Sequence, residues 1–277
     1  DIGKVGLMAK IEKDPEYLST LERGLSVLRA FDDQHPEMRL SEVAAVTGLS
    51  PAVARRCLNT LVALGYVAQH DRSFLLKPEV LAFGSAFHSS MHLEQVVVPA
   101  LQSLRDDTGD SASIVSLAGK DILYLAHVST NRRIRLGVNV GTRFPAHATS
   151  MGKAILAFLS DSEIAAFLAT APFDKFTEHT VTTADAMRER LQLIRARGYD
   201  SAFDELDFGI VSVAVPVFDS SRRAIAAVNC STSTTRISQE ELIQSRLPLL
   251  REAAAEIESA LRRFPSLATA LQADTAT

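Results

Sequence analysis

Hydrophobic positions in residues 40–67 follow the pattern of two short helices joined by a glycine turn at Gly48. Ser50 can cap the first free amides of the second helix, and Pro51 suits its first position, where a missing N–H loses no hydrogen bond. On a 3.6-residue period the apolar side chains of this helix share one side: Val53, Cys57, Leu58 and Leu61. Its small, basic and amide side chains share the other side: Ala52, Arg55, Arg56 and Asn59. Such a pair is typical of the helix-turn-helix, whose second helix lies in the DNA major groove.

The segments on either side of this pair complete a winged domain. Upstream, residues 17–31 carry apolar side chains at helical spacing, which predicts a helix packed behind the pair: Leu18, Leu21, Leu25, Leu28 and Phe31. Downstream, residues 66–68 and 74–76 read as two short strands around a polar turn, which is the pattern of a β-wing. A winged helix-turn-helix is therefore expected over residues 17–78. Arg72 at the wing tip is a candidate for contact with a phosphate or the minor groove, or else an isolated surface arginine.

The pattern changes after a helical linker at residues 79–107, in which a kink is expected near Pro99. A hairpin, a further strand at 133–140 and two later strands alternate with helices over residues 108–264. The expected helices are 150–159, one after Asp161, 184–197 and 238–263. This half is predicted to be an α+β domain with a mostly antiparallel sheet. Residues 1–16 and 265–277 are expected to be tails.

Composition limits the kind of protein but does not exclude DNA binding. The chain has 277 residues, is 47% hydrophobic and carries a net charge of −4. An acidic total excludes a protein coated in basic charge, so any DNA contact must be local. The formally charged residues between Ser50 and Gln69 are Arg55 and Arg56, which make the second helix locally positive. No apolar run reaches the ~18 residues of a membrane span, and no cleavable signal is evident, so a cytoplasmic protein with two buried, reduced cysteines (Cys57, Cys230) is expected.

The stretch HATSMGKAIL, residues 147–156, is the most site-like feature outside the winged domain. Ser150 is placed to cap a helix, and Gly152 lets a small group approach the backbone. Free amides at a helix start favour a carboxylate or phosphate, so a small organic acid is a reasonable ligand. An ordinary capped helix is the alternative.

Patterns that would indicate catalysis or a metal are weak. The chain lacks the G-x-S-x-G, Walker A, Rossmann, C-x-x-C and H-E-x-x-H patterns. Three acidic side chains, Asp204, Glu205 and Asp207, could serve acid-base chemistry or a cation, but a solvated loop is the simpler interpretation. His88 and His92 have the four-residue spacing of two metal ligands without an evident third. No enzyme, metal or cofactor is therefore expected.

Four motifs, in the same order along the chain, give it a resemblance to the IclR family of bacterial transcription regulators over about residues 17–264. They are LERGLSVLRAF, LSEVAAVTGLSPAVARRCLNTLVALGYV, FPAHATSMGKAILAFL and RGYDSAFDELDFGIVSVAVPVF. Within the family the chain looks most like regulators of aromatic-acid breakdown in the protocatechuate and β-ketoadipate pathway. The resemblance implies a GAF-like effector domain, a palindromic double-stranded operator, and a homodimer that can pair into a tetramer.

The resemblance also implies an effector pocket at particular residues of this chain. They are Leu136 and Phe144 as walls, Ser150 and Met151 at the helix start, and Ile210, Ser212, Asn229 and Ser231 on later strands. Where a family member has an acidic residue, this chain has Ala202, which favours a more apolar or differently placed ligand. Strand alternation points Arg133 and Arg135 away from the pocket if Leu136 points in.

The sequence therefore predicts a DNA-binding transcription regulator controlled by a small organic acid, either an aromatic acid or a β-ketoadipate-pathway intermediate. The residues expected to contact DNA are Ser50, Ala52, Arg55, Arg56, Asn59 and Arg72. The alternative from another class is an enzyme acting on a small acid in the second half, with the acidic cluster as its acid-base pair and a winged helix that does not bind DNA.

Overall fold

The computed structural model describes residues 16–32, 34–130 and 137–272. The chain divides into two compact units, one ending at Ser90 and the other beginning at Met91. Each unit has its own hydrophobic core. Within the described ranges, no helix is both long and apolar enough to cross a membrane.

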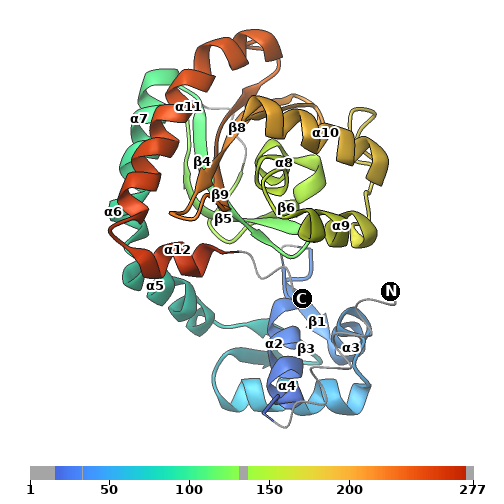
Figure 1. Ribbon diagram of the computed structural model, residues 1–277. Coiled ribbons are helices and arrows are strands. Elements are labelled where there is room, and N and C mark those ends of the chain that lie inside the picture. Colours follow the sequence, from blue (N-terminus) through green and yellow to red (C-terminus); the bar gives the residue numbers. More distant parts are fainter. Residues whose placement is uncertain (1–15, 33, 131–136, 273–277) are drawn as a thin grey trace. The chain divides into compact units, whose positions relative to one another are not determined.

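The first unit confirms the predicted helix pair and wing (Figure 1). Its helices are α2 (Ser19–Arg29), α3 (Leu40–Thr47), α4 (Pro51–Ala63) and α5 (Leu81–Ser90), with a short 3₁₀ helix η1 (Pro78–Val80). A three-stranded antiparallel sheet runs in the order β1 (Glu37–Arg39), β3 (Ser73–Leu76), β2 (Val67–His70). The first of these strands was not expected, because three residues are too few to display an alternating pattern.

The turn between α3 and α4 is built as the sequence predicts. Gly48 ends α3 in the left-handed region with φ +68°, which side chains with a Cβ rarely adopt. The Ser50 hydroxyl accepts a hydrogen bond from the Val53 amide at 3.4 Å, and Pro51 is the first residue of α4. The start of α4 is therefore fixed by local chemistry.

Helix α2 buries a different face from the one expected. Leu18, Leu21 and Leu25 are 68%, 60% and 44% exposed, whereas Val27 and Ala30 are buried. Positions two apart lie on opposite sides of a helix, so burial of Val27 turns Leu25 outward. The helix packs against α3 and α4 as predicted, but it does so without these three leucines.

The second unit confirms the predicted α+β class with an antiparallel sheet. Its six strands run in the order β6 (Arg143–Pro145), β5 (Asp121–Val128), β4 (Ser111–Ala118), β9 (Ala224–Ser233), β8 (Ile210–Phe218), β7 (Asp200–Phe203). All the pairings are antiparallel. The short strands at its two edges were not predicted. The strand expected at 133–140 falls partly outside the described residues, and its described part, 137–140, is not a strand.

Helices cover both faces of this sheet (Figure 1). On one face lie α7 (Val98–Thr108) and the long α11 (Gln239–Leu261), preceded by α6 (Leu93–Val96). On the other lie η2 (Ala146–Ala148), α8 (Ser150–Leu156), α9 (Asp161–Thr170) and α10 (Ala184–Arg197). The break expected near Pro99 comes at Val97, between α6 and α7. A last helix, α12 (Pro265–Leu271), occupies part of the expected tail and buries Leu267 and Leu271.

Helix α8 lies wholly inside the second unit. Every one of its residues is buried, and it packs against the central strands β8 and β9. A Cβ placed on Gly152 would come within 2.3 Å of the Ala146 carbonyl oxygen. The small group that approaches Gly152 is therefore the backbone of η2, and the suggestion that this glycine makes room for a ligand is wrong.

Candidate functional site

A cavity of about 350 Å³ lies beside the start of α8. Its apolar walls come from strands, helix and loops: Tyr124, Val138, Phe144, Met151, Phe176, Leu206 and Ile210. Its polar side chains come from the start of α8, strands β8 and β9, and the loop 204–209: Thr149, Ser150, Ser212, Asn229, Ser231, Glu205 and Asp207. Buried pockets of ~300 Å³ and above hold small organic ligands.

The polar part of the cavity is organised by two neighbouring strands. Ser212 and Ser231 are paired across β8 and β9, and Asn229 lies two residues from Ser231, so both side chains point to the same face. The hydroxyls of Ser150 and Ser212 are 2.8 Å apart. The Oδ1 atom of Asn229 is buried without a hydrogen-bond partner among the described residues. A buried acceptor of this kind calls for a donor from a ligand or water.

The structure brings together all but one of the residues predicted for the effector pocket. Those lining the cavity are Phe144, Ser150, Met151, Ile210, Ser212, Asn229 and Ser231. Leu136 lies outside the described residues. Ala202, singled out for its missing acid, also lines the cavity. Sequence reasoning missed Tyr124, Phe176 and Leu206. The first is on a predicted strand and could have been found from its alternation, but the other two lie in irregular segments without a period.

The cap of α8 differs from the one predicted. Thr149 is the capping residue, and its hydroxyl accepts a hydrogen bond from the Gly152 amide at 3.1 Å. Ser150 is the first helical residue. Its hydroxyl is not used for capping and forms a hydrogen bond with the hydroxyl of Ser212. The correction strengthens the case for Ser150 as part of the cavity.

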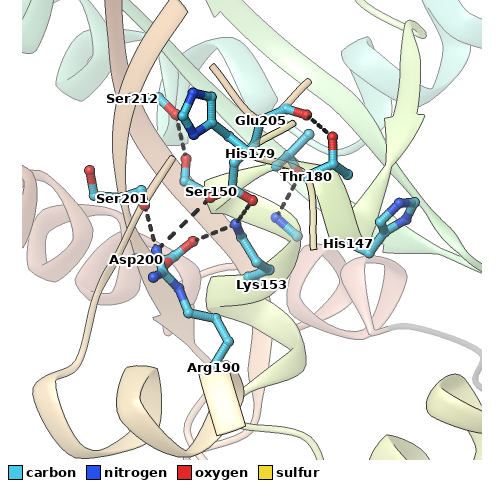
Figure 2. A network of polar contacts seen from close by, with 12 residues as sticks. His147, Ser150, Lys153, His179, Thr180, Arg190, Asp200, Ser201, Glu205 and Ser212 are labelled. Carbon is cyan, nitrogen blue, oxygen red and sulfur yellow. Dashed lines mark hydrogen bonds and ion pairs between the residues drawn. The ribbon is translucent and has the colours of Figure 1, made fainter. Parts of the chain in front are cut away.

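The acidic cluster is solvated only in part, because Asp207 is exposed but Glu205 is not. Glu205 is buried, and its Oε2 atom forms an ion pair with Nζ of Lys153, a side chain with no exposed surface (Figure 2). Lys153 also contacts Oδ2 of Asp200 at 3.3 Å. On the far side, Oδ1 of Asp200 accepts hydrogen bonds from Nε of Arg190 at 2.9 Å and Nη2 of Arg197 at 2.8 Å. Burial raises the pKa of Glu205, and the charge of Lys153 opposes the rise.

Two threonines fix the backbone of the loop that carries Glu205. Thr180 donates from its hydroxyl to the Glu205 carbonyl at 2.6 Å, as Figure 2 shows, and Thr177 donates to the Asp204 carbonyl at 2.5 Å. The Asp204 side chain accepts from the amides of Gly209 and Ile210 at 2.7 and 3.2 Å. Asp204 and Glu205 are thus engaged in holding the loop against the cavity, and this weakens the acid-base alternative.

The exposed side of α4 carries the residues predicted to contact DNA. Ala52, Arg55, Arg56 and Asn59 are exposed, as are Ser50 at the cap and Arg72 at the turn between β2 and β3. The opposite side of α4 is buried through Ala54, Cys57, Leu58 and Leu61. Both predicted faces of the helix are therefore present, with Ala54 added to the buried one.

The paired histidines do not share a helix. α5 ends at Ser90, and His92 has φ +54°, which interrupts the helical path. The His92 ring packs against Phe264, with centroids 5.1 Å apart. The four-residue spacing therefore does not place the two imidazoles on one helical face. Cys57 and Cys230 are both buried and free, as expected.

Two family models match the chain. Residues 20–71 match the IclR helix-turn-helix domain, and residues 85–259 match the C-terminal domain of bacterial transcriptional regulator IclR. The chain belongs to the IclR family. It is thus a DNA-binding transcription regulator of the effector-controlled IclR type.

Similar IclR-type proteins extend the comparison. The Pca regulon regulatory protein of Pseudomonas putida is 35% identical over 245 residues, covering 88% of this chain and 84% of the relative. A transcriptional regulator from Rhodococcus sp. RHA1 has a solved structure that is 41% identical, covers 89% of this chain and 99% of its own, and has a TM-score of 0.73. The inducer-binding domain of a PobR double mutant from Acinetobacter, solved with 3-hydroxybenzoic acid, is 31% identical, covers 58% of this chain and 94% of its own, and has a TM-score of 0.55.

Proposed function

We propose that the cavity beside α8 binds a small aromatic carboxylic acid, and that its occupancy controls operator binding through α4. The observation that carries this proposal is a cavity of about 350 Å³ with aromatic walls and a floor of hydroxyl and amide groups. Tyr124, Phe144 and Phe176 suit the faces and edges of a benzene ring. The ligand of the PobR domain, 3-hydroxybenzoic acid, is of this class.

The polar floor favours a ring that carries a hydroxyl. The unpartnered Oδ1 of Asn229 can accept a hydrogen bond from a phenolic O–H, and the pair Ser150 and Ser212 can donate to or accept from a second group. An aliphatic dicarboxylate of the β-ketoadipate pathway is the less suitable candidate, because Glu205 and Asp207 already place two carboxyl groups at the cavity wall.

A panel of small acids is expected to separate these classes. 3-Hydroxybenzoate, 4-hydroxybenzoate and protocatechuate should raise the melting temperature, and β-ketoadipate should not. A ligand bound only to the folded state at about 100 times its Kd adds about 2.7 kcal/mol of stability. Thermal-shift assays on the full chain give the measurement. A shift with β-ketoadipate alone would contradict the aromatic assignment.

The same assay tests the residues of the cavity. Ser212→Val and Asn229→Leu are expected to remove the ligand-induced shift while leaving the ligand-free protein folded, because each removes a polar group from the floor. Ser116→Val is the matched control: Ser116 is a buried serine of β4 that does not line the cavity, so its variant should keep the shift. A shift retained in both cavity variants would place the ligand elsewhere.

We also propose that Arg55 and Arg56 contact DNA directly, with Ser50, Ala52 and Asn59 on the same surface and Arg72 on the wing. Arg55→Ala and Arg56→Ala should each cost about 1–3 kcal/mol, or roughly 5- to 150-fold in affinity, if each arginine reads a guanine or pairs with a phosphate. Gel shifts on an operator fragment selected from random DNA give the measurement. Arg262→Ala, an exposed arginine of the second unit, is the control. Unchanged affinity in both α4 variants would contradict the assignment.

A homodimer on a palindromic operator, able to pair into a tetramer, completes the proposal. The exposed leucines in α2 and just before it support it, because Leu18, Leu21 and Leu25 form an apolar stripe at helical spacing that a second copy would cover. Two copies of α4 related by a two-fold axis would then read two half-sites.

A further inference from the structure

Glu205 stands out because it is both part of the cavity wall and part of a buried charge cluster. We propose that Glu205 takes up a proton from the solvent when a carboxylate ligand enters the cavity. The proposal rests on the function proposed above. It makes the affinity for an anionic ligand depend on pH through Glu205.

The two carboxylates of the cluster are not equally well paired, although both lie beside Lys153 (Figure 2). Asp200 accepts hydrogen bonds from two arginines, Arg190 and Arg197, on Oδ1, and its Oδ2 accepts no hydrogen bond from the described residues but lies 3.3 Å from Nζ of Lys153. Glu205 has Lys153 on Oε2, but its Oε1 lies 4.0 Å from Nη2 of Arg190, beyond hydrogen-bond distance. Lys153 is shared by both acids. Protonation of Glu205 therefore gives up fewer ion-pair contacts than protonation of Asp200 would.

The other charged groups around Glu205 are already engaged. On its own loop, Asp204 accepts from the amides of Gly209 and Ile210, and Asp207 accepts from the Phe208 amide. In the segment before α10, His179 is half exposed and its ring packs against Phe203 at 6.0 Å. The groups that act directly on the Glu205 carboxyl are therefore Lys153 of α8, Asp200 of β7 and Arg190 of α10.

A carboxylate ligand in the cavity adds a second negative charge near the Glu205 carboxylate. Among the described residues that line the cavity there is no lysine or arginine, whereas Glu205 and Asp207 are both acidic. Two carboxylates that share a site of low polarity cannot both remain ionised at low cost, so one of them takes a proton. Protonation of Glu205 removes the repulsion and supplies an O–H that can donate to the ligand. It also leaves Lys153, Arg190 and Arg197 opposite a single carboxylate, Asp200, so the cluster becomes more positive beneath the bound anion.

The pH dependence follows from this uptake. Burial already raises the pKa of Glu205, and a bound anion raises it further, so the complex holds a proton that the free protein has released. Affinity for the anion should therefore fall as pH rises from the pKa of Glu205 in the free protein to its higher pKa in the complex, by up to about tenfold per pH unit. A neutral ligand of the same shape should show no such fall.

Isothermal titration calorimetry in buffers of different ionisation enthalpy measures the proton number directly. With 3- or 4-hydroxybenzoate, the observed heat should vary with the buffer and give an uptake approaching one proton per ligand. The uncharged 4-hydroxybenzamide should give none on the wild-type protein. Glu205→Gln should bind the anion without uptake and with a flat pH profile. Glu178→Gln, an exposed carboxylate in the segment before α10, is the matched control and should keep the uptake.

The outcomes are distinct. Binding of a hydroxybenzoate without proton uptake by the wild-type protein overturns this inference and leaves the proposed function standing. Uptake that persists in Glu205→Gln, or that is equal for 4-hydroxybenzamide, also overturns it by assigning the proton to another group. If neither hydroxybenzoate binds, the proposed aromatic effector fails and this inference fails with it. The comparison of acid with amide uses only the wild-type protein, so it holds even if the Gln variant does not fold.

Discussion

Lys153→Met is expected to lower the free energy of unfolding by about 3–5 kcal/mol, because it removes the cation that two buried carboxylates share and leaves Glu205 without its close ion pair. Lys153 has no exposed surface, and its ammonium group contacts both Asp200 and Glu205. Methionine fills a similar volume, so the loss measures charge pairing more than packing. Urea unfolding followed by circular dichroism on the full chain gives the measurement.

Two comparisons make this test specific. Lys175→Met changes an exposed lysine of the same unit and should alter stability by no more than about 0.5 kcal/mol. Adding Glu205→Gln to Lys153→Met should recover part of the loss, because Glu205 is the carboxylate left without a close cation, whereas Asp200 keeps Arg190 and Arg197. A loss below about 1 kcal/mol in Lys153→Met would show that the cluster does not depend on this lysine.

Gly152→Ala is expected to destabilise the second unit by about 3 kcal/mol, the upper end of the usual cost of overpacking. The added methyl would lie 2.3 Å from the carbonyl oxygen and 2.5 Å from the Cα of Ala146, and backbone atoms cannot turn aside as a flexible side chain can. The start of α8 would have to move away from η2, and Ser150 would move with it. The melting temperature of the free protein should therefore fall, and the rise in melting temperature that the ligand causes should become smaller.

A second glycine provides the contrast. Gly84 lies in α5 with nothing within 4 Å of the position that a Cβ would take. Gly84→Ala should leave stability unchanged or raise it by about 0.5–1 kcal/mol, because alanine loses less backbone entropy than glycine in a helix. Equal losses at both positions would contradict the steric argument for Gly152.

Features set by local chemistry could be predicted from the sequence. Gly48, Ser50 and Pro51 define the turn and the start of α4 through backbone preferences and capping alone, and the structure confirms each of them. The hydrophobic pattern likewise placed the long strands β8 and β9 and the helices α10 and α11. The edge strands β1, β6 and β7 could not be found in this way, because three or four residues contain too little alternation to identify a strand.

The cavity was predictable only in part, and for a physical reason. Its strand and helix residues follow from the family resemblance, but Phe176 and Leu206 come from loops whose position depends on tertiary contacts. Glu205 was misread because its neighbours Asp204 and Asp207 make the segment look solvated. Its burial depends on Lys153, which lies 52 positions earlier and looks in the sequence like an ordinary helical lysine. Pairing over that distance leaves no local pattern.

Strand β7 lies at the edge of the sheet, and it carries Asp200 in the charge cluster and Ala202 at the cavity on the same face. Ala202 is the residue of this strand that lines the cavity, and its side chain is a single methyl group. An edge strand has one neighbour, β8, so a larger or charged side chain at this position displaces fewer packed residues than one on β8 or β9. Substitution of Ala202 would therefore be the change of cavity shape that costs the least packing, and it would leave the DNA-contacting residues proposed on α4 unaltered.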